Sequence, residues 1–323
     1  MNIINSIIGI LLLAIMIVIG YKIGQIVIEL NSPIMPKMNT VELTLPEQPS
    51  LTTVRWNHFP LTVHINDDFI RQKNPEYVND VRAALDRWQS TGIVSFSLVD
   101  NPDNADMIIE WAPNLKEIAL DTLGNTDLKF INITQFGIIQ NATIELLTKS
   151  ESKQLSSTDM VNLALHEIGH SVGLSHTDED DIMNPVLVIP SKTAKEISTH
   201  DINNLQKLYE LPSKPDLEII GVNATKFTFS RFGKDYFYLN ISISIQNIGL
   251  INAENFNLRL DADDIKINEE SIQKLEIGNI LNVFEVNIKT NKNFSSIQVK
   301  VDSSDSVDEL NETNNFLDIP VNE

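Results

Sequence analysis

The chain has 323 residues, a formal net charge of −20 and no cysteine. The excess of acidic side chains argues against nucleic acid or anionic lipid as partners, and the lack of cysteine excludes a disulfide framework. The length is sufficient for two domains that each bury a hydrophobic core.

The amino-terminal segment is almost wholly apolar. Asn5 and Ser6 are the polar interruptions between Ile3 and Ile19, and the apolar character resumes after Lys22 up to Ile28. About 20 apolar residues can cross a bilayer as a helix, so we predict a transmembrane anchor at residues 3–28. A cleaved signal peptide is the alternative, but no Lys or Arg precedes the run and no clear small-residue cleavage site follows it.

An extended linker is predicted at residues 29–54, because four prolines interrupt this stretch and it has little periodicity. A first folded domain is expected at residues 55–211. Its earliest clear element is Leu61–Ile65, where apolar and polar residues alternate as in a half-buried strand.

A long amphipathic helix is predicted in the second half of this domain. Ser156–Asp159 forms an N-cap cluster with a carboxylate at capping-box spacing. Val161, Leu165, Ile168 and Val172 follow at spacings of four, three and four residues. These four side chains should form the buried stripe of the helix.

The opposite face of this helix carries a metal-binding pattern. His166 and His170 lie one turn apart and project within about 40° of each other, so both can reach one ion. Gly173 is suited to end the helix in a left-handed conformation, and His176 then approaches from outside it. Three imidazoles with one open position are the ligands of a catalytic zinc, and Glu167 is placed to act as the general base.

A methionine follows the third histidine closely, in the run Asp181–Pro185. By itself Met183 would be interpreted as an ordinary core residue. A histidine pair on a helix is also more often structural than metal-binding. The combination of three histidines, a helix-ending glycine and a methionine in a tight turn favours a metal site, with Met183 as its apolar floor.

These motifs resemble the metzincin metallopeptidases, and within that clan the matrixins. The similarity extends to four further segments: Val81–Gln89, Val94–Phe96, Ala105–Ile109 and Asp201–Tyr209. The resemblance implies an α+β fold with a twisted mixed sheet and an active-site helix. It also implies one catalytic Zn²⁺ and endopeptidase activity.

The sequence departs from the animal matrixins in two respects. With no cysteine, the chain cannot block its zinc with a propeptide thiol. No histidine occurs between Trp88 and Leu165, so a second, structural zinc site is not expected. The acidic run Asp178–Asp181 has two readings, a calcium site or a solvated surface.

The resemblance also implies where a peptide substrate binds. Asn141–Leu147, which includes Ile144, would be the exposed edge strand above the cleft, to which a substrate adds as an antiparallel strand. Val186–Pro190 would form the wall of the main specificity pocket, with Val186 and Leu187 as substrate-binding residues. We therefore expect a preference for an apolar residue directly after the cut bond.

A second linker is predicted at residues 212–216, and a second domain at residues 217–320. From Phe237 to Ile245 apolar and polar residues alternate strictly, and this pattern predicts a half-buried strand in a β-sandwich. Three segments resemble the CARDB module, an immunoglobulin-like adhesion domain: Pro215–Leu217, Gln246–Gly249 and Glu309–Asn315. The resemblance implies a spacer or targeting role, and its ligand is either a protein, a cell-wall polymer or none.

The sequence therefore predicts a zinc metalloendopeptidase that hydrolyses extracellular proteins or peptides. Two alternatives stay open: a non-catalytic zinc-binding surface adhesion protein, and a zinc hydrolase acting on a non-protein amide such as a cell-wall component. Resemblance to exported enzymes and the low Lys and Arg content place both domains outside a membrane crossed once by residues 3–28. Lys22, on the far flank, does not support this orientation, and cleavage of the segment would make the protein secreted.

Overall fold

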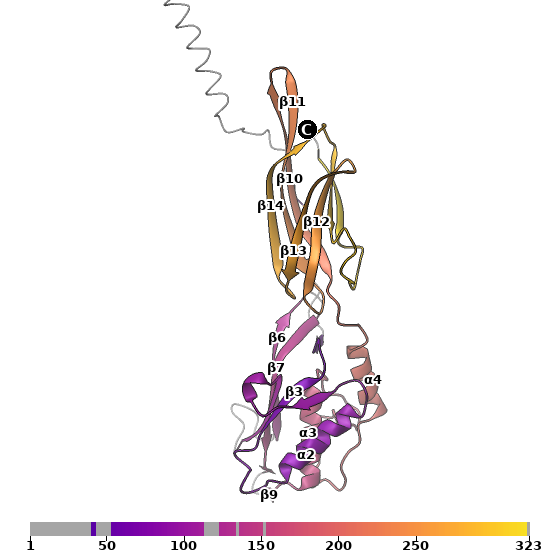
Figure 1. The fold of residues 1–323 in the computed structure, drawn as a ribbon. Coiled ribbons are helices and arrows are strands. Elements are labelled where there is room, and N and C mark those ends of the chain that lie inside the picture. Colours follow the sequence, from indigo (N-terminus) through magenta and orange to yellow (C-terminus); the bar gives the residue numbers. More distant parts are fainter. Residues whose placement is uncertain (1–39, 43–52, 113–122, 134–135, 151–152, 322–323) are drawn as a thin grey trace, which may run out of the picture.

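The computed structural model describes residues 40–42, 53–112, 123–133, 136–150 and 153–321. A mixed α/β domain and a β-sandwich are stacked end to end along the molecule (Figure 1). This confirms the predicted pair of architectures. The predicted anchor at 3–28 and most of the linker at 29–54 lie outside the described residues. In the part of the chain that is described, no helix has the length and apolar character needed to cross a membrane.

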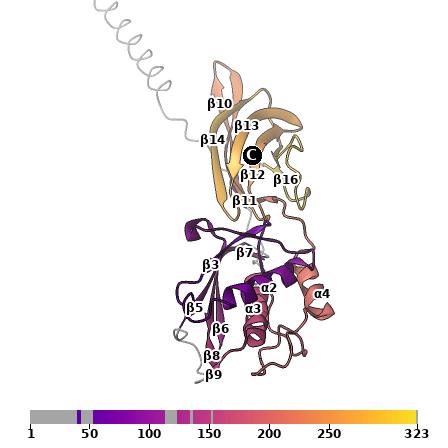
Figure 2. The ribbon, with the colours of Figure 1, turned by 60° about the horizontal axis from the view of Figure 1, so that its bottom comes forward.

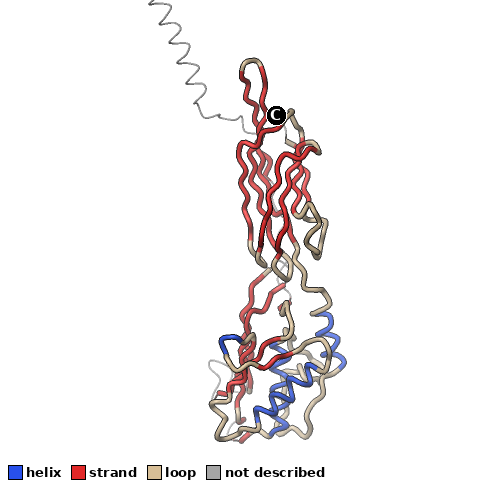
Figure 3. Tube along the Cα trace, in the orientation of Figure 1, coloured by secondary structure: helices blue, strands red, loops and turns tan. Residues whose placement is uncertain are grey.

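In its described residues, the first domain combines a six-stranded sheet, a small two-stranded sheet of β8 and β9, and three α-helices. Its elements, in chain order, are β2 (Thr53–Arg55), β3 (Leu61–Asn66), α2 (Tyr77–Gln89), β4 (Phe96–Leu98), a 3₁₀-helix (Pro102–Asn104), β5 (Met107–Ala112), β6 (Gly124–Asn132), β7 (Phe136–Leu147), β8 (Lys149–Ser150), β9 (Lys153–Gln154), α3 (Ser157–Ser171) and α4 (Thr199–Leu208). The sheet order is β2-β7-β5-β3-β4 with all pairs parallel, and β6 pairs antiparallel with β7. Figures 2 and 3 show the helices beside this sheet.

One edge strand of this sheet is β6, which lies against the helix α3. Its partner β7 is enclosed, because it pairs with β2 over its first residues, with β5 over its last, and with β6 along its other edge. The prediction that Asn141–Leu147 forms the exposed edge is therefore wrong. Ile144 is fully buried in the domain core, so it cannot contact a substrate.

The central helix α3 begins and packs as the sequence predicts. Ser156 and Asp159 form a capping box, each side chain bonding to the other residue's backbone N–H. The predicted stripe is buried throughout, from Val161 to Val172. Helix α2 packs beside it, and Trp88 donates its indole N–H to the carbonyl of Leu165 at 2.9 Å. The face of α3 that carries the histidines therefore lies opposite a buried apolar stripe.

The second domain is a sandwich of two four-stranded sheets. Its elements are β10 (Leu217–Arg231), β11 (Lys234–Asn247), β12 (Ala253–Ala262), β13 (Ile265–Leu275), β14 (Ile280–Thr290), β15 (Ser296–Val301) and β16 (Phe316–Pro320). One sheet has the order β1-β10-β11-β14 and the other β13-β12-β15-β16. Strand β1 (Thr40–Glu42) comes from ahead of the first domain and pairs antiparallel with β10. The alternating residues Leu239, Ile241, Ile243 and Ile245 of β11 are all buried, as the sequence predicts.

Candidate metal centre

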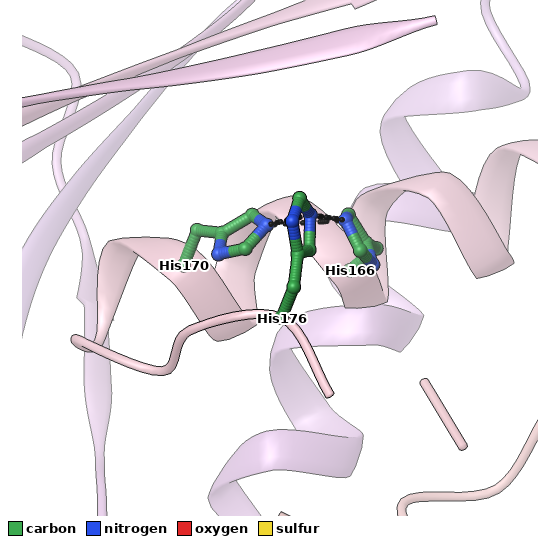
Figure 4. Close-up of side chains that lie close together, drawn as sticks. All are labelled: His166, His170 and His176. Atoms are coloured by element: carbon green, nitrogen blue, oxygen red, sulfur yellow. Dashed lines mark hydrogen bonds between the residues drawn. The ribbon is translucent and has the colours of Figure 1, made fainter. Parts of the chain in front are cut away.

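Three imidazole rings converge on one point at the surface of α3 (Figure 4). The Nε2 atom of His170 lies 3.1 Å from that of His166 and 3.0 Å from that of His176. The Nε2 atoms of His166 and His176 are 3.2 Å apart. Two rings come from the helix and the third from the chain that follows it.

The turn after α3 brings the third ring into place. Gly173 has a φ of 97°, which is left-handed and unfavourable for other residues. The backbone N–H of Gly173 donates to the carbonyl of His170 at 2.9 Å, and that of Leu174 to the carbonyl of Gly169 at 3.0 Å. A side chain at Gly173 would also place its Cβ 2.3 Å from the carbonyl oxygen of Val54. Both the backbone angle and the contact with β2 require glycine.

The outer nitrogens of two rings are bound to backbone carbonyls. Nδ1 of His166 lies 2.7 Å from the carbonyl oxygen of Ile182, and Nδ1 of His170 lies 2.8 Å from that of Leu174. A carbonyl oxygen can only accept, so each Nδ1 carries the proton and each Nε2 presents a lone pair. Burial lowers the pKa of both rings, to about 4 for His170. The neutral form, which binds metals, is therefore the stable one at neutral pH.

The spacing of the nitrogens fits a tetrahedral cation. Zinc binds imidazole nitrogen at about 2.0–2.1 Å, which places two nitrogens of a tetrahedral site about 3.3 Å apart. The three pairs lie at 3.0–3.2 Å, close to that value. The donor set of three neutral imidazoles also matches catalytic zinc sites, which keep a fourth position open.

Glu167 lies beside this centre and is buried. Thr126 of β6 donates its hydroxyl to Oε2 of Glu167 at 2.7 Å. Burial raises the pKa of Glu167 to about 7, although the hydrogen bond from Thr126 acts to lower it. A carboxyl group with a pKa near neutrality can both accept and return a proton.

Strand β6 supplies two contacts to Glu167 that the sequence did not reveal. Besides Thr126, Gly124 lies so close that a Cβ atom there would come 2.4 Å from Oε1 of Glu167. Neither residue belongs to a recognisable motif, and 41 positions separate Thr126 from Glu167. The pairing of β6 with β7 brings both to the centre.

Gly124→Ala is expected to displace the carboxylate of Glu167 without removing a metal ligand. Because a misplacement of about 1 Å can cost a catalytic group about 100-fold in rate, we expect kcat to fall by about 10- to 100-fold. Peptide cleavage assays and zinc analysis of the purified variant check this. Unchanged kcat, or loss of zinc, would contradict the expected contact.

The methionine turn packs beneath the ligands. Met183 is fully buried, and a Cβ at Gly169 would come 2.3 Å from its sulfur, so the glycine between His166 and His170 makes room for it. The turn also supplies the carbonyl of Ile182 that orients His166. Met183 therefore lies where the sequence places the floor of the site.

Of the acidic run after His176, only Asp181 belongs to a group of described residues that could hold a metal ion, together with His200 and Asp201. Asp178, Glu179 and Asp180 are exposed, and they do not gather into a group that could bind a cation. Asp181 is buried and accepts hydrogen bonds from the hydroxyl of Thr177 and the backbone N–H of Met183. Its role is to fix the turn.

His200 of α4 adds a titratable contact to this turn, with Nδ1 2.8 Å from Oδ2 of Asp181. The hydrogen bond to Asp181 raises the pKa of His200. Burial acts to raise the pKa of Asp181, but hydrogen bonds from His200 and Thr177 outweigh it and lower that pKa. The stabilisation that protonated His200 gives the fold is complete below the ordinary histidine pKa of about 6.5. It is lost as the pH rises through the raised pKa of His200.

We therefore expect the melting temperature of the wild type to fall between pH 6 and pH 9 by more than that of His200→Ala. Asp181 stays ionised throughout this range, since its pKa is lowered, so the difference reports His200. Differential scanning calorimetry of both proteins across this range is the measurement. Parallel pH profiles would show that the pair does not stabilise the turn.

A cleft of about 720 Å³ runs past the three histidines. Strand β6 forms one side through Gly124, Asn125, Thr126 and Leu128, and the chain after the methionine turn contributes Leu187. Of the three residues predicted to bind substrate, Leu187 lines this cleft, Val186 is 68% exposed and does not line it, and Ile144 lies in the core.

The remaining histidines lie outside the centre. His58 contacts Asp106, His64 bonds the carbonyl of Val99, and His200 bonds Asp181. These placements agree with their interpretation as ordinary structural or surface residues.

Both domains match models of known protein families. The family model described as Matrixin matches residues 55–210, and the model described as CARDB matches residues 214–318. Karilysin of Tannerella forsythia is 24% identical over 172 residues, which are 49% of this chain and 34% of karilysin. The chain thus spans about a third of that relative's length.

This chain is similar to one solved domain, whose structure was determined by NMR in solution. That domain is described as part of a cell surface protein from Methanosarcina acetivorans. It is 30% identical, covers 25% of this chain and 73% of that domain, and has a TM-score of 0.23. The two family matches confirm the resemblance seen in the sequence. Residues 55–210 of the chain therefore match the matrixin model, and residues 214–318 match the CARDB model.

Proposed function

We propose that the chain is a zinc-dependent endopeptidase whose metal is bound by His166, His170 and His176 through Nε2. The observation that carries the proposal is the convergence of three Nε2 lone pairs while two of the rings donate Nδ1–H to backbone carbonyls. Bound zinc would supply Lewis-acid chemistry, lowering the pKa of water from 15.7 toward 7 and polarising the peptide carbonyl.

Glu167 is the general base and then the general acid in this proposal. Its carboxylate accepts a proton from the attacking water and delivers it to the leaving amine. Thr126 fixes one carboxylate oxygen, so the group is positioned before substrate arrives. Its raised pKa of about 7 suits a group that must take up and release a proton in each cycle.

Protein or peptide substrates would bind along β6. This strand pairs with β7 on one side, and its other edge has no partner strand among the described residues. An extended peptide can add there antiparallel through backbone hydrogen bonds. Leu187, which lines the cleft, supports a preference for an apolar residue after the cut bond.

Metal removal tests the proposal directly. The purified chain is expected to contain about one zinc ion, to cleave a fluorogenic peptide or casein, to lose this activity with a chelator and to regain it with added zinc. Chelator-resistant cleavage or the absence of stoichiometric metal would contradict the proposal. Zinc without cleavage of any peptide would favour the adhesion protein, and cleavage of a cell-wall amide alone would favour the other hydrolase.

We also propose that both domains lie outside the membrane and are anchored by residues 3–28. The apolar run of that segment supports a helix of sufficient length. Digestion of intact cells with an added protease should then degrade both domains. Protection of both until the cells are lysed would contradict this location.

A further inference from the structure

We infer that the C-terminal domain fixes the outer half of the β6–β7 hairpin and thereby extends the substrate cleft on the amino-terminal side of the cut bond. This inference rests on the proposed peptidase function. It gives the β-sandwich a part in substrate binding, whereas the sequence predicted only a spacer or targeting module.

The hairpin reaches well beyond the sheet that carries it. Strand β5 pairs only with residues 142–147 of β7, whereas β6 and β7 remain paired as far as Asn132 and Gly137. The outer half therefore consists of residues 129–132 of β6 and 136–141 of β7. Within the first domain it is supported at its side by the three residues of β2. A two-stranded hairpin is marginally stable by itself, so this half needs another partner.

That partner is the C-terminal domain. A hydrophobic cluster at the joint, which we call the joint cluster, is separate from both domain cores. Its members are Ile133, Phe136 and Ile138 from the hairpin and Ile248, Leu250, Ile277 and Leu310 from the sandwich. Ile138 and Leu250 are completely buried within it.

One hydrogen bond and one close backbone approach also join the two domains. The side-chain amide of Asn57 donates to the carbonyl of Leu250 at 2.9 Å. The carbonyl oxygen of Asn132, at the end of β6, lies 3.8 Å from the position a Cβ would take at Gly278, just ahead of β14. The end of the hairpin is thus in contact with two loops of the second domain.

The connection between the domains is also fixed. The backbone N–H groups of Ile248, Leu250 and Leu310 donate to the carbonyls of Asp216, Lys214 and Pro215. At Gly249 a Cβ would lie 2.3 Å from the backbone nitrogen of Asp216, so the connecting chain passes directly over this glycine. These bonds hold residues 214–216 against the same loops of the sandwich that contribute to the joint cluster.

The inner half of the same β6 strand lines the cleft and contacts Glu167. Strand β6 runs from Gly124 at the centre toward the joint. A substrate added antiparallel to β6 therefore enters from the joint, with the residues ahead of its cut bond lying along residues 126–132. At about 3.3 Å per residue, this edge accommodates about six substrate residues.

The outer half of β6 has an apolar character that suits such a substrate. Phe130 and Ile131 are 43% and 38% exposed, although both are large hydrophobic side chains. The substrate class that fits is an extended, unfolded polypeptide with apolar residues several positions ahead of the cut bond. A short peptide that ends near the cut bond would not reach this part of the strand.

The full-length chain with Leu250→Asp tests the inference. A charge in the joint cluster should separate the hairpin from the sandwich. The core of the sandwich should stay intact, because Leu250 does not belong to it. Leu250→Met, which keeps the apolar volume, is the matched control. Phe232→Asp controls for an added charge elsewhere, since this side chain is 88% exposed in the turn between β10 and β11.

Two readouts separate positioning from a general loss of structure. Hydrogen exchange should accelerate at residues 129–132 and 136–138 in Leu250→Asp, and remain slow in β5. With matched peptides that carry two or eight residues ahead of the cut bond, KM for the longer peptide should rise about tenfold. For the shorter peptide, the change should be less than about twofold, and both control variants should match the wild type.

Unchanged exchange in the outer half of the hairpin would overturn the inference, and so would an equal loss of activity on both peptides. A wild type that cleaves neither peptide would contradict the proposed function and, with it, the role of the joint in substrate binding. The exchange rates would in that case still report whether the sandwich fixes the hairpin. The two failures are therefore distinguishable.

Discussion

Glu167→Gln is expected to lower kcat/KM by about 10²- to 10⁴-fold, the range that a general base contributes. The amide is nearly the same size as the carboxylate and can still contact Thr126, so the cleft should keep its shape. The amide cannot, however, accept a proton from water. Kinetics with a fluorogenic peptide measure the effect.

The zinc content of Glu167→Gln should equal that of the wild type, because Glu167 is not part of the converging group of three histidines. Metal analysis of the same preparation provides the control. Near-normal activity would show that Glu167 is not the base. Loss of the metal would show that it is a ligand or supports one.

His170→Ala should abolish both zinc binding and cleavage. Mutating a group that merely orients a metal ligand typically costs about 10- to 100-fold in affinity, so removing the ligand itself should cost more than about 100-fold. The ring of His170 is the one whose Nε2 lies nearest both others, at 3.0 and 3.1 Å, so two nitrogens alone would remain.

A histidine outside the centre provides the comparison. His64→Ala removes an imidazole that bonds the carbonyl of Val99 and is not part of the converging group of three, and it should retain both zinc and activity. Isothermal titration with zinc after chelator treatment compares the variants. Equal affinity in His170→Ala and the wild type would refute the three-histidine site.

The metal centre was predictable because its information is local. His166 and His170 are fixed by the pitch of one helix, and Gly173 and His176 by the turn that ends it. A capping box at Ser156 and an apolar stripe set where that helix starts and which face it buries. Short-range geometry of this kind is contained in about twenty consecutive residues.

The edge strand of the cleft was assigned wrongly for the opposite reason. Residues 141–147 have the alternation typical of a strand, but alternation does not tell which neighbours pair with it. Strand β6 has three polar residues in a row at 125–127 and the adjacent apolar residues Phe130 and Ile131, so it lacks a regular alternation of its own. Only the pairing of β7 with β2, β5 and β6 shows which strand is exposed.

By itself, the sequence determined the two domain types, the convergence of three histidines and the acid beside them, because helix periodicity, caps and strand alternation depend on residues close together in the chain. Tertiary structure decided the contacts of Thr126 and Gly124 with Glu167 and the joint cluster that links Leu250 to the hairpin. Those contacts join segments tens to more than a hundred residues apart. They arise from packing and strand pairing, for which no local pattern exists.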